Sequence, residues 1–253
     1  MMQKSVYDQE EFFQLYQKLR TNPISLNEIV EKPTMFRLVG NLQHKRVLDL
    51  GCGTGVHLQH YLQQGASYAV GIDLSEKMIA QAEKNLQQMG FNRQHYQCYT
   101  LAMEQLAQCP DNQFDLVTSS FAFHYIEDFP ALLTQIAAKL TDNGQLIFSQ
   151  EHPIVTCYQG GERWEKDQNK QQIAYRLNYY RDEGLRQRNW FQQPFKTYHR
   201  KLATIINALI QAGFAIQQIE EPMLADQPEW HNEFKDLQHR PVLLFIKAQK
   251  IAK

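Results

Sequence analysis

Closely spaced glycines follow an apolar run near residue 50, and an acidic residue closes the next apolar run. The first segment reads VLDLGCGTG over residues 47–55, and the acid is Asp73. Glycine lets the backbone approach a ligand closely, and the start of a following helix offers unpaired N–H groups. A carboxylate at the end of the next strand can accept hydrogen bonds from ribose hydroxyls. This order of groups predicts a binding site for an adenosine-containing cofactor.

The glycine spacing also separates one cofactor class from another. Dinucleotide-binding turns follow the pattern GxGxxG. Here Val56 stands where the third glycine would be. The turn therefore favours a cofactor without a phosphate at this point and argues against a nicotinamide oxidoreductase. The simpler alternatives are a tight turn in an unrelated α/β protein and, for Asp73, a helix cap beside Ser75.

Three residues are candidates for handling a proton or orienting a substrate. Glu151 and His152 directly follow a predicted strand, and His199 opens a predicted helix. Histidine titrates near neutral pH, and an adjacent carboxylate can orient it or bind a cation. The alternatives are a turn histidine for His152, a surface carboxylate for Glu151 and a helix cap for His199. We interpret His124, after an earlier strand, as a residue that packs or forms hydrogen bonds at the start of the next helix.

Tyr16 and Arg20 lie one turn apart on one face of a predicted N-terminal helix. Together they could close over the cofactor, with Arg20 meeting a carboxylate. The alternative is an exposed pair that contributes little to stability.

Strands alternate with helices through the middle of the chain. Short apolar runs predict strands at 46–50, 68–72, 94–101, 114–119 and 145–149. Amphipathic segments predict helices at 56–64, 76–89 and 130–140. This alternation predicts an α/β fold with a doubly wound, mostly parallel sheet, whose ligands bind beyond the carboxyl ends of the strands.

The flanking segments divide the chain into three predicted parts. Helices at 9–20 and 26–42, the second interrupted near Pro33, form an N-terminal helical cap over residues 1–44. The cofactor-binding core spans 45–151 and 199–253, and resumes with a helix at 202–212 and strands at 214–220 and 241–248. Residues 152–198 break the alternation, and we expect an insertion that covers the active site, with a short hairpin around 182–184.

Composition excludes several classes of function. The 253 residues carry a formal net charge of −1, which argues against a nucleic-acid partner. Four scattered cysteines without CxxC or zinc spacing fit a reducing compartment and predict no metal site. The N-terminus lacks the apolar core of a signal peptide, and no run approaches the roughly 20 apolar residues of a membrane span. We therefore expect a cytoplasmic protein without membrane contact.

At these motifs the sequence resembles the class I S-adenosylmethionine-dependent methyltransferases. VLDLGCGTG, GIDLSEKMIAQAEKN and FDLVTSSFAFHYIEDF are similar to three motifs of that family, the last to its small-molecule branch. Glu151-His152-Pro153 and Tyr198-His199-Arg200 also resemble a bacterial group within it. The resemblance implies a Rossmann-like, seven-stranded sheet with an antiparallel last strand. It also implies S-adenosylmethionine as cofactor and S-adenosylhomocysteine as product.

The resemblance implies a contact for each residue of these motifs. The methionine end of the cofactor would lie against the first and fourth strand ends: Gly51, Cys52, Gly53, Ser119 and Ser120. Asp49 would help to fix the glycine loop. Asp73 would bind the ribose hydroxyls. The adenine would lie among Leu74, Met78, Ala102, Met103 and Glu104.

Methyl transfer from a sulfonium is a direct in-line displacement that depends mainly on positioning. A base is needed only where the acceptor must lose a proton. The expected acceptor is an O, N or C atom of a small molecule. An RNA or protein methyltransferase and a non-catalytic cofactor-binding protein remain alternatives, and a homodimer is left open. Clustering of five arginines would favour the RNA or protein alternative: Arg176, Arg181, Arg186, Arg188 and Arg200.

Overall fold

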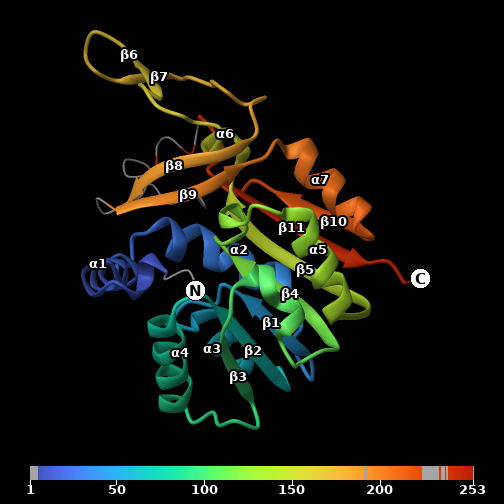
Figure 1. Ribbon diagram of the computed structural model, residues 1–253. Helices are drawn as coiled ribbons and strands as arrows, with labels where there is room; N and C mark the ends of the chain where they lie inside the picture. The colour runs from blue at the N-terminus through green and yellow to red at the C-terminus, as the bar shows by residue number, and fades with distance from the viewer. Residues whose placement is uncertain (1–4, 191–192, 224–233, 235–236, 238, 253) are drawn as a thin grey trace.

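The central element is a seven-stranded sheet with the strand order β10-β11-β5-β4-β1-β2-β3 (Figure 1). The structure is a computed structural model that describes residues 5–190, 193–223, 234, 237 and 239–252. β1, β2, β3, β4 and β5 pair in parallel, whereas β11 is antiparallel to both β5 and β10. The predicted doubly wound α/β fold with an antiparallel last strand is therefore confirmed.

The elements of this core follow the predicted alternation. The strands are β1 (Arg46–Leu50), β2 (Tyr68–Asp73), β3 (Tyr96–Thr100), β4 (Phe114–Ser120), β5 (Leu140–Glu151), β10 (Phe214–Glu220) and β11 (Leu243–Lys250). The helices are α3 (Val56–Gln63), α4 (Glu76–Gln88), α5 (Phe129–Lys139) and α7 (Leu202–Gln211), with short 3-10 turns η3 (Met103–Gln108) and η4 (Phe123–Tyr125). β5 begins five residues earlier than expected, directly after α5.

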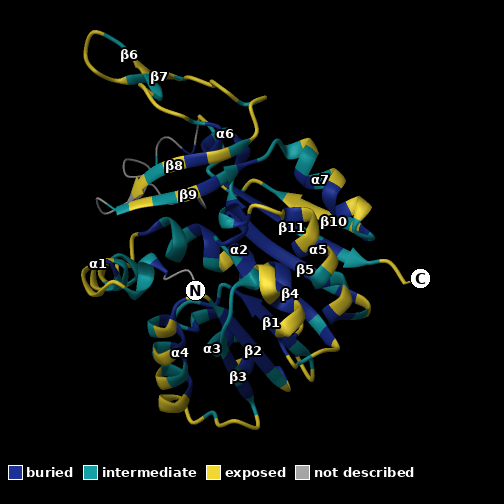
Figure 2. Cartoon of the chain, viewed as in Figure 1, coloured by how far each residue is buried: buried dark blue, intermediate teal, exposed yellow. Residues whose placement is uncertain are grey.

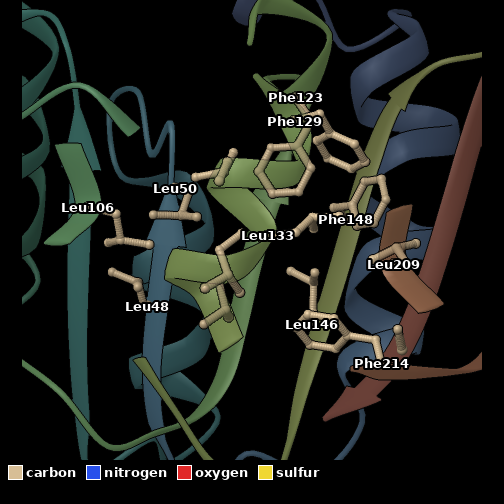
Figure 3. Packing of buried hydrophobic residues seen from close by; sticks show 14 of the residues in the cluster. Leu48, Leu50, Leu106, Phe123, Phe129, Leu133, Leu146, Phe148, Leu209 and Phe214 are labelled. Carbon is tan, nitrogen blue, oxygen red and sulfur yellow. The ribbon is translucent and has the colours of Figure 1, made fainter. Parts of the chain in front are cut away.

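Most residues of the central strands are buried (Figure 2), because both faces of the sheet are covered. Leu48 and Leu50 of β1 pack on the face covered by α5 and α7, together with Leu133, Leu146 and Phe148 (Figure 3). Val47, which directly precedes Leu48, points to the opposite face, which α2 (Lys32–Val39) and α3 cover. This alternation follows from the two-residue period of a strand, and it fixes which residues of β1 face each layer.

The N-terminal segment packs at the same end of the sheet as the glycine loop. It contains η1 (Val6–Asp8), α1 (Glu10–Arg20), the π-helical turn η2 (Asn27–Glu31) and α2 (Lys32–Val39). Pro33 lies in the first turn of α2, directly after η2. The predicted interruption near Pro33 is thus a change from π-helix to α-helix and not a break.

Residues 152–198 form a short helix and two hairpins outside the main sheet. They contain α6 (Pro153–Thr156), β6 (Trp164–Lys166) paired with β7 (Gln172–Tyr175), and β8 (Gly184–Trp190), which pairs with β9 (Gln193–His199). In Figure 1 the β8–β9 hairpin lies above the sheet, and β6–β7 extends away from it. The predicted hairpin turn at 182–184 is wrong, because Gly184 begins β8 opposite His199.

Within the described residues, no helix combines the length and the apolar character needed to span a bilayer.

Candidate active site

A cavity of about 1090 Å³ lies at the carboxyl ends of the parallel strands. Its lining comes from the glycine loop, the ends of β2, β4 and β5, the N-terminal segment and the β8–β9 hairpin. Thirteen of the seventeen residues predicted for the site lie in this lining: Tyr16, Arg20, Gly51, Cys52, Gly53, Asp73, Leu74, Met78, Ala102, Met103, Glu104, Ser120 and Glu151. Pockets for single small molecules usually measure roughly 300–1,000 Å³, so this cavity has room for a cofactor and a second molecule.

The loop after β1 exposes backbone to the cavity. Gly51 has φ +72°, and a Cβ added there would lie 2.7 Å from the Cβ of Ala122. Gly53 has φ +52°, and an added Cβ would meet nothing nearer than the Tyr16 hydroxyl at 3.9 Å. Glycine is therefore required at the first position by packing and at both by the left-handed backbone. The loop leaves a side-chain-free cradle that fits a closely bound ligand.

Asp73 ends β2 with its carboxylate against the glycine loop. One oxygen accepts a hydrogen bond from the backbone N of Gly53 at 2.9 Å, and the other accepts one from Ser75 N at 2.9 Å. Burial raises the pKa of Asp73 to about 6, although these N–H groups favour the charged form. Each carboxylate oxygen retains a free lone pair. The group therefore holds the loop and can still accept from the two hydroxyls of a ribose.

The walls beside Asp73 are largely apolar. Met78 is buried at the start of α4, and Leu74 is partly exposed beside it. Ala102 and Met103 follow β3, and the Met103 methyl group would lie 3.0 Å from a Cβ at Gly51. Such a lining suits the flat faces of an adenine.

Asp49 and Ser119 lie behind the cavity rather than in its lining. Asp49 accepts a hydrogen bond from the Thr118 hydroxyl at 2.8 Å, and Ser119 donates to the backbone oxygen of Leu50 at 2.8 Å. Both are fully buried, and burial raises the pKa of Asp49 to about 6. Their contacts tie β1 to β4, so they support the loop and do not face a ligand.

Glu151, at the end of β5, lines another part of the cavity. Glu151 forms an ion pair with Arg188 of β8, whose other terminal nitrogen donates to Val155 O at 3.0 Å. His124 of η4 also lines the cavity, and burial lowers its pKa to about 4, so it is neutral at pH 7. Its Nδ1 makes no hydrogen bond to any described group. The sequence interpretation of His124 as a packing residue missed this position.

His152 and His199 do not lie in the cavity lining. His152 contacts Glu221 Oε1 at 2.8 Å through Nε2 and accepts from Ile154 N at 3.1 Å through Nδ1. His199 contacts the Thr156 hydroxyl at 2.8 Å and the backbone oxygen of Tyr180 at 2.9 Å. Because both ring nitrogens of each histidine are engaged inside the fold, neither is placed to take a proton from a substrate.

One further cavity residue and its buried partner had no signal in the sequence. His57 of α3 lines the cavity, and it faces the buried Glu31 of η2. No motif shows this pairing, because 26 positions separate the two residues in the sequence. In the part of the chain that the structure describes, no group of three or more His, Cys, Asp or Glu residues is arranged to hold a metal ion.

A seven-stranded sheet with one antiparallel strand, a glycine loop after β1 and a carboxylate at the end of β2 define a Rossmann-like cofactor-binding fold. The family model described as "Methyltransferase domain" matches residues 48–148, the segment that carries these features.

Comparison with known proteins extends the match over the whole chain. A Haemophilus influenzae protein described as uncharacterised is 66% identical over 98% of both chains. The solved structure of an S-adenosylmethionine-dependent methyltransferase from Mesorhizobium loti is 31% identical, covers 89% of this chain and 100% of its own, and gives a TM-score of 0.77. A ubiquinone biosynthesis O-methyltransferase of Nitrosomonas europaea is 35% identical, but the match spans only 50% of this chain and 49% of that enzyme.

The chain therefore belongs to the S-adenosylmethionine-dependent methyltransferases. Its cavity fits that cofactor: a glycine cradle, a buried carboxylate and an apolar wall lie around one space.

Proposed function

We propose that this enzyme transfers a methyl group to a small-molecule acceptor bound in the same cavity as the cofactor. The observation that carries the proposal is the size and position of that cavity, about 1090 Å³ between the sheet, the N-terminal segment and the β8–β9 hairpin. The relative from Nitrosomonas europaea, matched over about half of each chain, is described as acting in ubiquinone biosynthesis, which supports a small acceptor of that general kind.

The arginines that would favour an RNA or protein substrate are largely used inside the fold. Arg186 donates to Cys157 O and Leu185 O, and Arg188 pairs with Glu151. Arg200 donates to Ile126 O and Glu127 O, and burial lowers its pKa to about 10. Two of the five, at positions 176 and 181, are exposed. This distribution does not form a basic groove and supports the small-molecule acceptor.

The cap and the insertion are proposed to close the two ends of the cavity. Tyr16 and Arg20 of α1 line the cofactor end, where Arg20 meets the cofactor carboxylate. Arg188 and Phe195 of the hairpin line the acceptor end, beside Glu151. Closing both ends excludes water and holds the acceptor in line with the methyl group.

In this proposal the glycine loop and Asp73 hold the cofactor, which supplies the activated methyl group when bound. Glu151, fixed by Arg188, orients the acceptor. His124, neutral at pH 7, accepts a hydrogen bond from an acceptor hydroxyl or amine. The chain's contribution is positioning, and proton transfer is required only for acceptors that must lose a proton.

The test is a screen of metabolite pools for acceptor-dependent release of S-adenosylhomocysteine. We expect release with a small-molecule fraction and none with RNA or intact protein fractions. Calorimetric titration should show binding of S-adenosylmethionine and no binding of NAD. Turnover confined to RNA or protein fractions would refute the small-molecule proposal, and failure to bind S-adenosylmethionine would refute the cofactor.

A further inference from the structure

Buried polar side chains from distant parts of the chain meet behind the cavity. Glu31 ends η2 and is 0% exposed, and its Oε1 accepts hydrogen bonds from the hydroxyls of Ser120 at 2.6 Å and Ser149 at 2.8 Å. Its other oxygen, Oε2, lies 3.6 Å from Nε2 of His57. At that distance the contact is an ion pair and not a hydrogen bond. Among the described residues neither atom has a hydrogen-bond partner.

Glu31 and His57 are both buried, and each favours the charged form of the other. Burial acts to raise the pKa of Glu31, but His57 and the two serine hydroxyls reverse this and lower it. Burial acts to lower the pKa of His57, but Glu31 and Asp49 raise it against the opposing charge of Arg20. A buried ion pair is weak evidence for stability. Stability alone therefore does not explain this pair. We infer that its role concerns the ligand cavity, which His57 lines.

Glu31 determines whether Ser120 and His57 act as hydrogen-bond donors or acceptors toward the cavity. Ser120 donates its hydroxyl proton to Glu31, so its oxygen remains as a hydrogen-bond acceptor. Glu31 favours the protonated imidazole of His57, which donates at both ring nitrogens and carries a positive charge. Ser120 and His57 line the cavity. One buried carboxylate thus supplies the wall with an acceptor and a cationic donor.

We propose that this arrangement binds the zwitterionic amino-acid end of the cofactor. Ser120 accepts a hydrogen bond from the ammonium group, and His57 donates to the carboxylate alongside Arg20. Glu31 touches neither group and is a positioning residue. The inference rests on cofactor binding and is independent of the acceptor.

The test uses calorimetric titration, without turnover, of three thioether ligands. S-adenosylhomocysteine carries the ammonium and the carboxylate, its decarboxylated analogue keeps the ammonium, and methylthioadenosine carries neither. We expect His57→Gln to weaken S-adenosylhomocysteine binding by roughly tenfold or more, and to leave the other two ligands within about twofold. Glu31→Gln should follow the same pattern, because the amide still accepts from Ser120 but holds no proton on His57.

Ser120→Ala should differ from these two variants. We expect it to weaken both ammonium-bearing ligands by roughly tenfold and to leave methylthioadenosine within about twofold. His60→Gln is the matched control on the same helix, because His60 stacks on Phe36 and is not in the cavity lining. It should change none of the three affinities.

An equal loss of affinity for all three ligands would show a structural role and overturn the inference. The inference would also fall if His57→Gln and Glu31→Gln showed no loss of affinity specific to S-adenosylhomocysteine. Methylthioadenosine binding reports that each variant is folded. If Glu31→Gln does not fold, His57→Gln and Ser120→Ala decide the question between them. If the wild-type protein binds no S-adenosylhomocysteine, the proposed function falls together with the inference. If it binds and the variants behave like wild type, only the inference falls.

Discussion

Asp73 serves two purposes, because the same carboxylate holds the glycine loop and faces the cavity. We expect Asp73→Ala to weaken binding of both S-adenosylhomocysteine and methylthioadenosine by roughly tenfold or more, since both ligands carry the ribose. The free group has a pKa of about 6, and ribose hydroxyls favour its charged form. Wild-type affinity for methylthioadenosine should therefore fall below about pH 6.

Calorimetric titration of methylthioadenosine at pH 5 and pH 8 checks both parts of this prediction. The alanine variant should lack the change between the two pH values. Equal affinity of variant and wild type at pH 8 would remove Asp73 from the ribose site.

Asp49 is an acidic group buried behind the cavity, and its stability contribution has a predictable sign. Burial raises its pKa from 3.8 to about 6 in the folded state. A raised carboxyl pKa adds stability below pH 4, and that contribution is lost as the pH rises through 6. Asp49→Asn cannot ionise and keeps an oxygen for Thr118. Between pH 5 and pH 8, the variant should therefore gain about 1 kcal/mol relative to wild type.

Urea unfolding of both proteins at the two pH values measures this difference. The other titrating groups, Asp73 included, are common to both proteins and cancel to first order. A difference that is constant with pH would show that Asp49 is not the titrating group.

At the scale of elements, the β8–β9 hairpin is joined to the core through a side chain near its middle. Arg188 pairs with Glu151 of β5 and donates to Val155 O. Arg188→Met keeps the apolar stem but removes these contacts, which should cost roughly 1–2 kcal/mol of local stability. Amide exchange in β8 and β9 should then be about 5–30 times faster.

Hydrogen exchange measured by mass spectrometry tests this prediction, with Arg176→Met on the exposed part of the insertion as the control. The affinity for S-adenosylhomocysteine should stay within about twofold, because the hairpin closes the acceptor end. Unchanged exchange in both strands would show that other contacts hold the hairpin.

At the scale of the whole molecule, one aromatic cluster connects the core to the cavity. Phe148 of β5 lies 4.8 Å from Phe123 and 6.2 Å from Phe129, measured between ring centroids (Figure 3). Phe123 begins η4, which carries His124. Phe148→Ala should destabilise the protein by about 3–5 kcal/mol, because it leaves a cavity in a close-packed layer.

Urea unfolding measures this loss. Ile219→Ala, at an exposed position of the edge strand β10, is the control and should change stability by less than about 0.5 kcal/mol. A loss below 1 kcal/mol for Phe148→Ala would mean that the layer collapses into the space.

Local sequence predicted the fold and the cofactor half of the site. The glycine loop, Asp73 and the strand–helix alternation could all be recognised in the sequence. Each depends on neighbours within a few residues or on a fixed period. The carboxyl ends of parallel strands then converge on one edge, so Gly51, Asp73 and Ser120 had to meet. Insertion 152–198 has no such period, and its predicted hairpin turn was wrong.

The tertiary structure decided which polar side chains face the cavity. His152 directly follows β5 and was expected to reach the site, yet Glu221 and the backbone of α6 engage its ring. His124 was expected to pack, yet it lines the cavity. Glu31 and His57 meet because η2 and α3 cover the same face of the sheet. The direction and partners of a side chain depend on packing between layers, and that information is spread over the whole chain and is not contained in any one motif.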